Sequence, residues 1–279
     1  MKIGVLSGKG GTGKTLISVN LASVIENSVY LDCDVEEPNG ELFFKPEISE
    51  TRDVNVDIPE FNNDKCIGCH ECVDFCNFNA LAFIFEKPVL FKEICHSCGG
   101  CSLVCQHDAV KEVKKIVGTV EIGKSLNNVV ATGKMKIGEA SGVPIVKELL
   151  KETLKYGSSE VIIDCPPGSG CLVHESIQSV DYCVLVAEPT LFGTHNLEMV
   201  YELAKIFRKP IGVVLNKCLE EYNPSEEFCR KNNIKIIGRV PFDHDLGSMN
   251  SKGIIATRNS EKYKEVFEKI YNNIRNEVL

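Results

Sequence analysis

The sequence lacks the excess of positive charge that a non-specific nucleic-acid-binding protein carries. Its 31 Lys and Arg residues are outnumbered by 39 Asp and Glu residues, and the net charge at pH 7 is −8. It also lacks any run of about 18 apolar residues, so we expect no membrane-spanning helix. Its first residues, MKIGVLSGKGG, run directly into a strand and a glycine turn, unlike a signal or transit peptide. We therefore expect a cytoplasmic protein with neither a nucleic-acid nor a membrane partner.

Tryptophan is also absent, whereas cysteine is unusually frequent, with 14 residues in a chain of 279. Disulfides in such number are typical of small exported proteins with little core, but here 43% of the residues are hydrophobic. In a reducing compartment, clustered cysteines more often bind metal. The cysteines therefore predict metal ligands.

Short apolar strands alternate with amphipathic helices along most of the chain, which predicts an α/β fold with a doubly wound, mostly parallel sheet. Between Ile116 and Ile137, β-branched residues predict a hairpin or strand pair. The predicted strands are Lys2–Leu6, Ser28–Leu31, Val161–Asp164, Tyr182–Ala187, Ile211–Asn216 and Lys235–Val240, and the predicted helices are Leu16–Ile25, Val143–Tyr156 and Leu197–Phe207.

The C-terminal segment places its apolar residues, Tyr263 to Val278, on one helical face. Such a helix either packs against the sheet or lies on a membrane surface. Its polar face mixes Glu and Lys, whereas a membrane-surface helix is usually basic there. We therefore expect packing against the sheet.

A glycine-rich segment between the first strand and the first helix fits the pattern G-x-x-x-x-G-K-[ST], the P-loop signature in its expected context. Backbone N–H groups of such a loop surround phosphate oxygens, and the following helix adds its positive end. Lys14 would neutralise the β- and γ-phosphates, and the Thr15 hydroxyl would ligate Mg²⁺. The predicted nucleotide-binding residues of the loop are Gly8, Lys9, Gly10, Gly11, Thr12, Gly13, Lys14 and Thr15.

The first lysine of this loop, Lys9, makes the motif resemble the deviant Walker A motif of the MinD/ParA family. That family includes the nitrogenase iron protein and scaffold ATPases of iron–sulfur assembly. The resemblance implies ATP hydrolysis by a P-loop NTPase and ATP-dependent pairing, as a homodimer or with a related ATPase. In the dimer, Lys9 would reach across to the nucleotide of the partner.

Other positions match the same family in order. Asp34 is similar to the aspartate that orients the attacking water, and Asp32 would contact the P-loop or the magnesium waters. Asp164, at the end of an apolar strand, resembles the Walker B carboxylate on magnesium. Asn216 would contact adenine, and Pro241 would lie in the loop over the base. The resemblance thus implies Lys9, Lys14, Asp34 and Asp164 as catalytic residues, with magnesium at Thr15, Asp32 and Asp164 and with ATP or ADP bound.

Two cysteine runs share the spacing C-x2-C-x2-C-x3-C, the signature of bacterial ferredoxins with two [4Fe–4S] clusters. Three cysteines of each run bind one cluster and the fourth crosses to the other, so a small α+β ferredoxin-type domain is expected at residues 58–114. The ATPase domain would comprise residues 1–57 and 115–279. Zinc is the competing metal for paired thiolates. Cluster one is assigned to Cys66, Cys69, Cys72 and Cys105, and cluster two to Cys76, Cys95, Cys98 and Cys101.

Among the remaining cysteines, Cys183 lies in an apolar strand and should be part of the core. Cys165 and Cys171 lie beside the segment that resembles switch II, near the dimer interface that the family implies. They are speculative ligands of a cluster that bridges two subunits, and ordinary core or surface positions are the alternative.

Three functions remain open on these residues. The first is assembly or delivery of a metal cofactor to an apo-metalloprotein, as the kinship with scaffold ATPases suggests. The second is ATP-gated electron donation to a redox partner, similar to the nitrogenase iron protein. A non-redox positioning ATPase is the third and weakest alternative.

Overall fold

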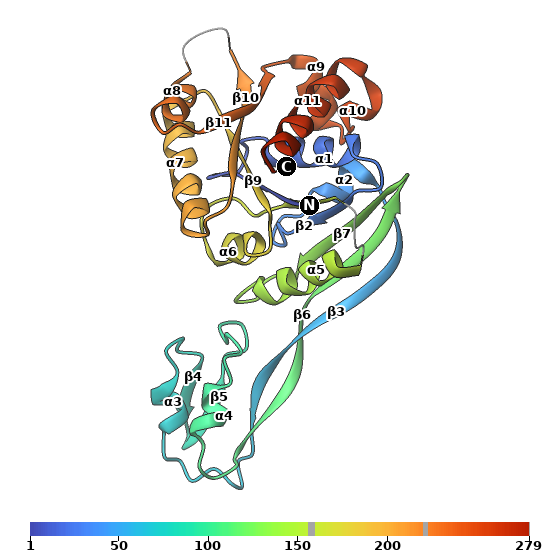
Figure 1. Cartoon of the computed structure of the whole chain (residues 1–279). Helices are drawn as coiled ribbons and strands as arrows, with labels where there is room; N and C mark the ends of the chain where they lie inside the picture. Colours follow the sequence, from blue (N-terminus) through green and yellow to red (C-terminus); the bar gives the residue numbers. More distant parts are fainter. Residues whose placement is uncertain (156–159, 220–222, 279) are drawn as a thin grey trace.

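The computed structural model describes residues 1–155, 160–219 and 223–278 (Figure 1). Its main strands are β1 (Lys2–Leu6), β2 (Val29–Asp32), β3 (Glu47–Phe61), β6 (Val110–Ser125), β7 (Asn128–Met135), β8 (Val161–Asp164), β9 (Tyr182–Ala187), β10 (Ile211–Cys218) and β11 (Lys235–Pro241). Within the described residues these nine strands form one sheet, in the order β11-β10-β9-β1-β8-β2-β7-β6-β3. All neighbouring pairs from β11 to β7 are parallel, whereas β6 and β3 are antiparallel additions at one edge. The predicted doubly wound, mostly parallel sheet is confirmed.

Helices cover both faces of this sheet (Figure 1). The main helices are α1 (Lys14–Val24), α2 (Gly40–Phe44), α5 (Val143–Lys155), α6 (Cys171–Ile177), α7 (Leu191–Ile206), α8 (Pro224–Lys231), α9 (His244–Ser251), α10 (Ala256–Asn259) and α11 (Glu261–Val278). One core cluster includes Leu149 of α5, Ile177 of α6 and Leu197 of α7, and the other includes Leu21 of α1 and Phe267 of α11.

Local chemistry accounts for most helix limits. Helix α7 begins at Leu191, earlier than the predicted Leu197, because the Thr190 side chain caps it by accepting the Gly193 N–H at 2.9 Å. Helix α5 is described to Lys155, and the expected end at Tyr156 lies outside the described residues.

The C-terminal helix α11 packs as expected. Tyr263, Phe267, Ile270 and Ile274 of α11 are buried, and α11 contacts α1 and β11. In the described part of the chain, no helix is both long and apolar enough to cross a membrane.

A two-stranded arm leaves the edge of the sheet. Strand β7 stops pairing where Met135 lies opposite Gly118, and beyond that point β6 pairs only with β3, from Asn55–Ile116 to Phe61–Val110. Figure 1 shows this arm carrying a small module apart from the main sheet. The module contains α3 (Glu71–Phe75), the hairpin of β4 (Leu81–Ile84) and β5 (Lys87–Leu90), and α4 (Gly100–Val104).

The strand pair expected between Ile116 and Ile137 is present, but β6 begins earlier, at Val110. Strand β3 and helix α2 were not expected from the sequence. The expected domain limits at residues 57/58 and 114/115 fall within paired strands of the arm. That the module is a separate domain stays a prediction.

Candidate functional site

The glycine-rich loop joins β1 to α1 at the carboxyl edge of the parallel strands. Gly13 caps α1 with a φ of 95°, and a Cβ at that position would lie 2.1 Å from Nδ2 of Asn216. That amide donates a hydrogen bond of 2.8 Å to the carbonyl of Thr12. The structure therefore places Asn216 against the phosphate loop, and its contact with adenine stays a prediction.

A hollow of about 1710 Å³ opens over this loop. Its wall includes Lys14 and Thr15 of the loop, Asp34 after β2, and Pro241 at the end of β11. Residues predicted from three distant parts of the sequence thus line one cavity. They meet because parallel strands end at the same edge of a sheet.

Lys14 is the centre of a buried charge cluster. Its Nζ lies 2.6 Å from Oδ1 of Asp164 and 3.5 Å from Oδ2 of Asp34. Burial acts to lower the pKa of Lys14, but the neighbouring carboxylates, Asp164 foremost, outweigh burial and raise it. Lys14, one of the two predicted catalytic lysines, is therefore in contact with both predicted catalytic aspartates.

Asp32 lies beneath the hollow rather than on its wall. It is completely buried, and its carboxylate accepts backbone N–H groups of Asn39 at 3.0 Å and Gly40 at 2.7 Å. Burial, with the charge of Asp164 beside it, raises the pKa of Asp32 to about 7. Asp32 thus shapes the loop that carries Asp34, and its contact with magnesium stays a prediction.

Tyr30 is a member of this buried group that sequence reasoning missed. Its hydroxyl donates to Oδ2 of Asp164 at 2.9 Å, and the side chain is fully buried. Lys14 and Tyr30 therefore engage both carboxylate oxygens of Asp164. In the sequence, Tyr30 looks like an ordinary apolar residue of a strand.

Lys9 is held by Glu188, a second residue that sequence reasoning missed. The Lys9 ammonium lies 2.9 Å from Glu188 and 4.9 Å from the centroid of the Phe192 ring. Lys217 binds the other oxygen of Glu188 at 2.6 Å and donates to the Gly11 carbonyl at 2.9 Å. Partial burial acts to raise the pKa of Glu188, but the two ammonium groups have the larger combined effect, so the pKa is lowered. An acid at the end of the parallel strand β9 was a usable signal, the same one that marked Asp164.

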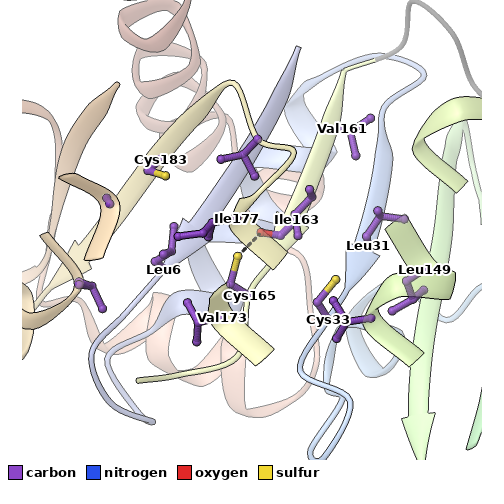
Figure 2. Packing of buried hydrophobic residues seen from close by; sticks show 14 of the residues in the cluster. Leu6, Leu31, Cys33, Leu149, Val161, Ile163, Cys165, Val173, Ile177 and Cys183 are labelled. Carbon is purple, nitrogen blue, oxygen red and sulfur yellow. Dashed lines mark hydrogen bonds between the residues drawn. The ribbon is translucent and has the colours of Figure 1, made fainter. Parts of the chain in front are cut away.

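The pair Cys165 and Cys171 is divided between core and surface. Cys165 is fully buried, with its Sγ 3.7 Å from the carbonyl of Ile163 (Figure 2). Cys171, in contrast, is exposed. Burial raises the pKa of the Cys165 thiol well above its ordinary value. This placement argues against the bridging role suggested for the pair, because a bridging ligand must reach the surface as a thiolate. Cys183 lies in the same core, as expected.

Two small spaces inside the module, of about 20 Å³ each, are each lined by four cysteines. Cys66, Cys69, Cys72 and Cys105 line the first, and Cys76, Cys95, Cys98 and Cys101 line the second. The structure thus brings together the two expected sets, including the crossed fourth cysteine of each run. Among the described residues, no three His, Cys, Asp or Glu side chains converge as they would around one metal ion.

The two cysteine runs also share one backbone shape. Positive φ angles recur at matching positions, at Gly68 and His70 in the first run and at Ser97 and Gly99 in the second. Left-handed residues between right-handed ones turn backbone N–H groups toward one point, a concavity found at anion and iron–sulfur sites. At the first run, the Ala80 N–H also approaches Sγ of Cys76 at 3.4 Å. The backbone shape of both runs and the chemistry of their thiols therefore suit an iron–sulfur cluster.

Comparison with known proteins decides the family. A model of the CobQ/CobB/MinD/ParA nucleotide binding domain matches residues 3–256. The chain belongs to the CobQ/CobB/MinD/ParA family. An uncharacterized protein of Methanocaldococcus jannaschii is 31% identical to it over 99% of this chain and 96% of that protein. An iron-sulfur cluster carrier protein of the same archaeon is 23% identical, over 98% and 84% respectively.

Solved structures agree with this assignment. The cell division ATPase MinD of Pyrococcus furiosus matches with a TM-score of 0.60 at 20% identity, over 99% of this chain and 98% of its own. MinD of Pyrococcus horikoshii, complexed with Mg-ADP, also scores 0.60, at 18% identity over 98% and 95%. The predicted family and fold are confirmed, and the chain is a P-loop NTPase of the MinD/ParA type, a type that hydrolyses ATP. Dimerisation, the inserted ferredoxin domain and its clusters stay predictions.

Proposed function

We propose that this chain is a cytoplasmic, ATP-hydrolysing iron–sulfur protein that works in the assembly or delivery of a metal cofactor. The observation that carries the proposal is that two four-cysteine cavities lie on the same chain as a P-loop. A role in cofactor delivery is supported by relatives named iron-sulfur cluster carrier protein. Those from Methanococcus maripaludis and Pyrococcus horikoshii are each 22% identical to this chain over 98% of its length.

In this proposal, ATP reorganises the charges around Lys14. The γ-phosphate competes with Asp164 for the Lys14 ammonium, because both are anions within reach of one cation. Asp164 and Thr15 are then free to hold magnesium, and Asp34 orients the attacking water.

Pairing of two chains requires a second exchange. Lys9 leaves Glu188, to which it is bound at 2.9 Å, and reaches the nucleotide of the partner subunit. The partner is a second copy of this chain or a related ATPase.

The cysteine sets are proposed to hold one [4Fe–4S] cluster each. Cys66, Cys69, Cys72 and Cys105 would bind the first cluster, and Cys76, Cys95, Cys98 and Cys101 the second. Such clusters supply one-electron redox chemistry. The client of a delivery protein is an apo-metalloprotein that accepts iron and sulfide.

ATP-gated electron donation to a redox partner is the second candidate. It is favoured by the position of the second cysteine set, whose loop contributes His96 to the wall of the nucleotide hollow. ATP-dependent transfer of labelled iron to an apo-protein would support delivery. ATP-dependent reduction of an acceptor without loss of iron would support electron donation instead.

The first test is iron and labile sulfide on anaerobically purified protein. Two clusters require about eight irons per chain, and we expect Cys69→Ser and Cys98→Ser each to lower the content to about four. Cys171→Ser is the matched control, an exposed cysteine outside the module, and should leave the iron unchanged. Less than about one iron per chain after anaerobic reconstitution would refute cluster binding.

A further inference from the structure

One residue belongs to both the nucleotide hollow and a cysteine cavity. His96 lies between Cys95 and Cys98 and lines the second cysteine cavity together with the hollow over the P-loop. Its ring stacks on Phe78 with 4.0 Å between centroids, so it is held in place. In the described residues, the first cysteine cavity shares no lining residue with that hollow.

Lys115 connects the same loop to the ATPase fold, through a hydrogen bond to the loop and an ion pair with Glu139. Lys115 of β6 donates to the Lys92 carbonyl at 2.8 Å and to Oε2 of Glu139 at 2.7 Å. The side chains of Lys115 and Glu139 are only 19% and 11% exposed, so water screens the pair less than a surface ion pair. Lys92 precedes Cys95 in the loop between β5 and α4, which lies beside the start of α5 in Figure 1.

Lys115 lies at a position from which it can affect the orientation of the module. It lies where the arm leaves the sheet, next to an irregularity at which Val54 pairs with Gly118 and Asn55 pairs with Ile116. Beyond this point two strands support each other alone, and a two-stranded ribbon is a weak support. The ion pair therefore braces the module against the ATPase fold at the place where the arm can bend.

Glu139, the other member of the ion pair, adjoins the wall of the nucleotide hollow. Glu139 directly precedes Ala140, Ser141 and Gly142, which line the hollow over the P-loop. A ligand that moves this wall therefore moves Glu139, and with it Lys115 and the loop that carries Cys95.

We infer that the Lys115–Glu139 ion pair and His96 couple nucleotide occupancy to the second cysteine set and leave the first set unaffected. They are positioning residues, because they act through the loop rather than on a reacting atom. The inference deepens the proposed function and rests on it, since it concerns clusters that the cysteines are proposed to hold.

The test is the reduction potential of each cluster with ADP and with a non-hydrolysable ATP analogue. Cys98→Ser and Cys69→Ser protein isolate the first and the second cluster for spectroscopic titration. We expect the analogue to shift the potential of the second cluster only, and we expect Glu139→Gln and His96→Ala to lose that shift. Lys114→Met is the matched control, because Lys114 of the same strand makes an exposed pair with Asp57 instead, and it should retain the shift.

Equal shifts of both clusters, no shift, or a shift that survives in Glu139→Gln would overturn the inference. Amide hydrogen exchange of residues 91–99, with and without nucleotide, gives a readout that needs no cluster. We expect nucleotide to change exchange there in the wild type and in Lys114→Met, but not in Glu139→Gln. Protein that binds no iron yet shows this pattern refutes the proposed function and leaves the coupling intact. If nucleotide does not change the amide exchange of residues 91–99, the coupling is refuted even when iron is present.

Discussion

Lys14→Met should destabilise the nucleotide-free protein far more than the loss of a surface ion pair would. The side chains of Lys14 and Asp164 are 7% and 1% exposed, and the charged atoms lie 2.6 Å apart. Removing one partner of a buried pair costs about 3–5 kcal/mol, because the other charge stays buried without compensation. Methionine has nearly the volume of lysine, so a change in packing contributes little.

The loss should grow with pH. Lys14 lowers the pKa values of Asp32 and Asp34, both of which burial raises, so its removal raises these pKa values further. An acid with a raised folded-state pKa binds protons more tightly when folded, so folding stability falls as pH rises through that range. Lys14 itself has a raised pKa, and its own contribution is constant below its ordinary value of 10.5.

Urea unfolding followed by far-ultraviolet circular dichroism, at pH 5.5 and pH 8, measures both effects. The double variant Lys14→Met/Asp164→Asn should recover about 2 kcal/mol of the loss, because it removes a stranded carboxylate. Lys205→Met is the control, since its ion pair with Glu202 is half exposed, and it should unfold like the wild type. A loss below about 1 kcal/mol with no recovery in the double variant would show that Lys14 does not neutralise this cluster.

Three further predictions concern the surroundings of this cluster. Because the pKa of Asp32 is raised from 3.8 to about 7, the stability of the wild type should fall as pH rises through that interval. In Asp32→Asn, the urea midpoint of unfolding should depend less on pH there, and an unchanged dependence would exclude Asp32 as its source. Gly40→Ala should cost about 1–3 kcal/mol in thermal unfolding, because its Cβ would lie 2.3 Å from a ring carbon of Tyr30, and a wild-type melting temperature would contradict this packing. Glu188→Gln should release Lys9 and lower the dissociation constant of the ATP-dependent dimer by up to about fivefold, equivalent to about 1 kcal/mol for a partly exposed ion pair. Analytical ultracentrifugation measures this constant, and a weaker dimer would mean that Glu188 supports the dimer contact.

Sequence reasoning succeeded where the signal is local. The P-loop was recognisable because its glycines and Lys14 lie within eight consecutive positions between a strand and a helix. The cysteine runs were recognisable because each repeats the same short spacing, and the clusters that they would hold stay predictions. The alternation of short strands and helices was sufficient for a doubly wound fold, since an apolar strand without polar alternation needs cover on both faces.

Sequence reasoning failed where a role depends on a distant partner. Lys217 became a functional candidate only when β10 was placed beside β9, where Lys217 binds Glu188. Tyr30 has no recognisable signal in the sequence, because its role depends on Asp164, which lies 134 positions away. For Cys165, beside the segment that resembles switch II, the sequence left a bridging role and a core position open, and the structure places its side chain in the core (Figure 2).

The sequence by itself determined the class of this protein and the location of its phosphate loop and of its two cysteine runs. Phosphate loops and cysteine runs are short segments whose backbone shape follows from residue type and spacing. Only the tertiary structure decided how the centres are related. The second cysteine cavity adjoins the nucleotide hollow because His96 lines both. Its loop is held there by the long arm and by half-buried Lys115. That relation depends on strand register and on where the arm bends, and pairing between distant strands is not encoded in any short segment of the chain.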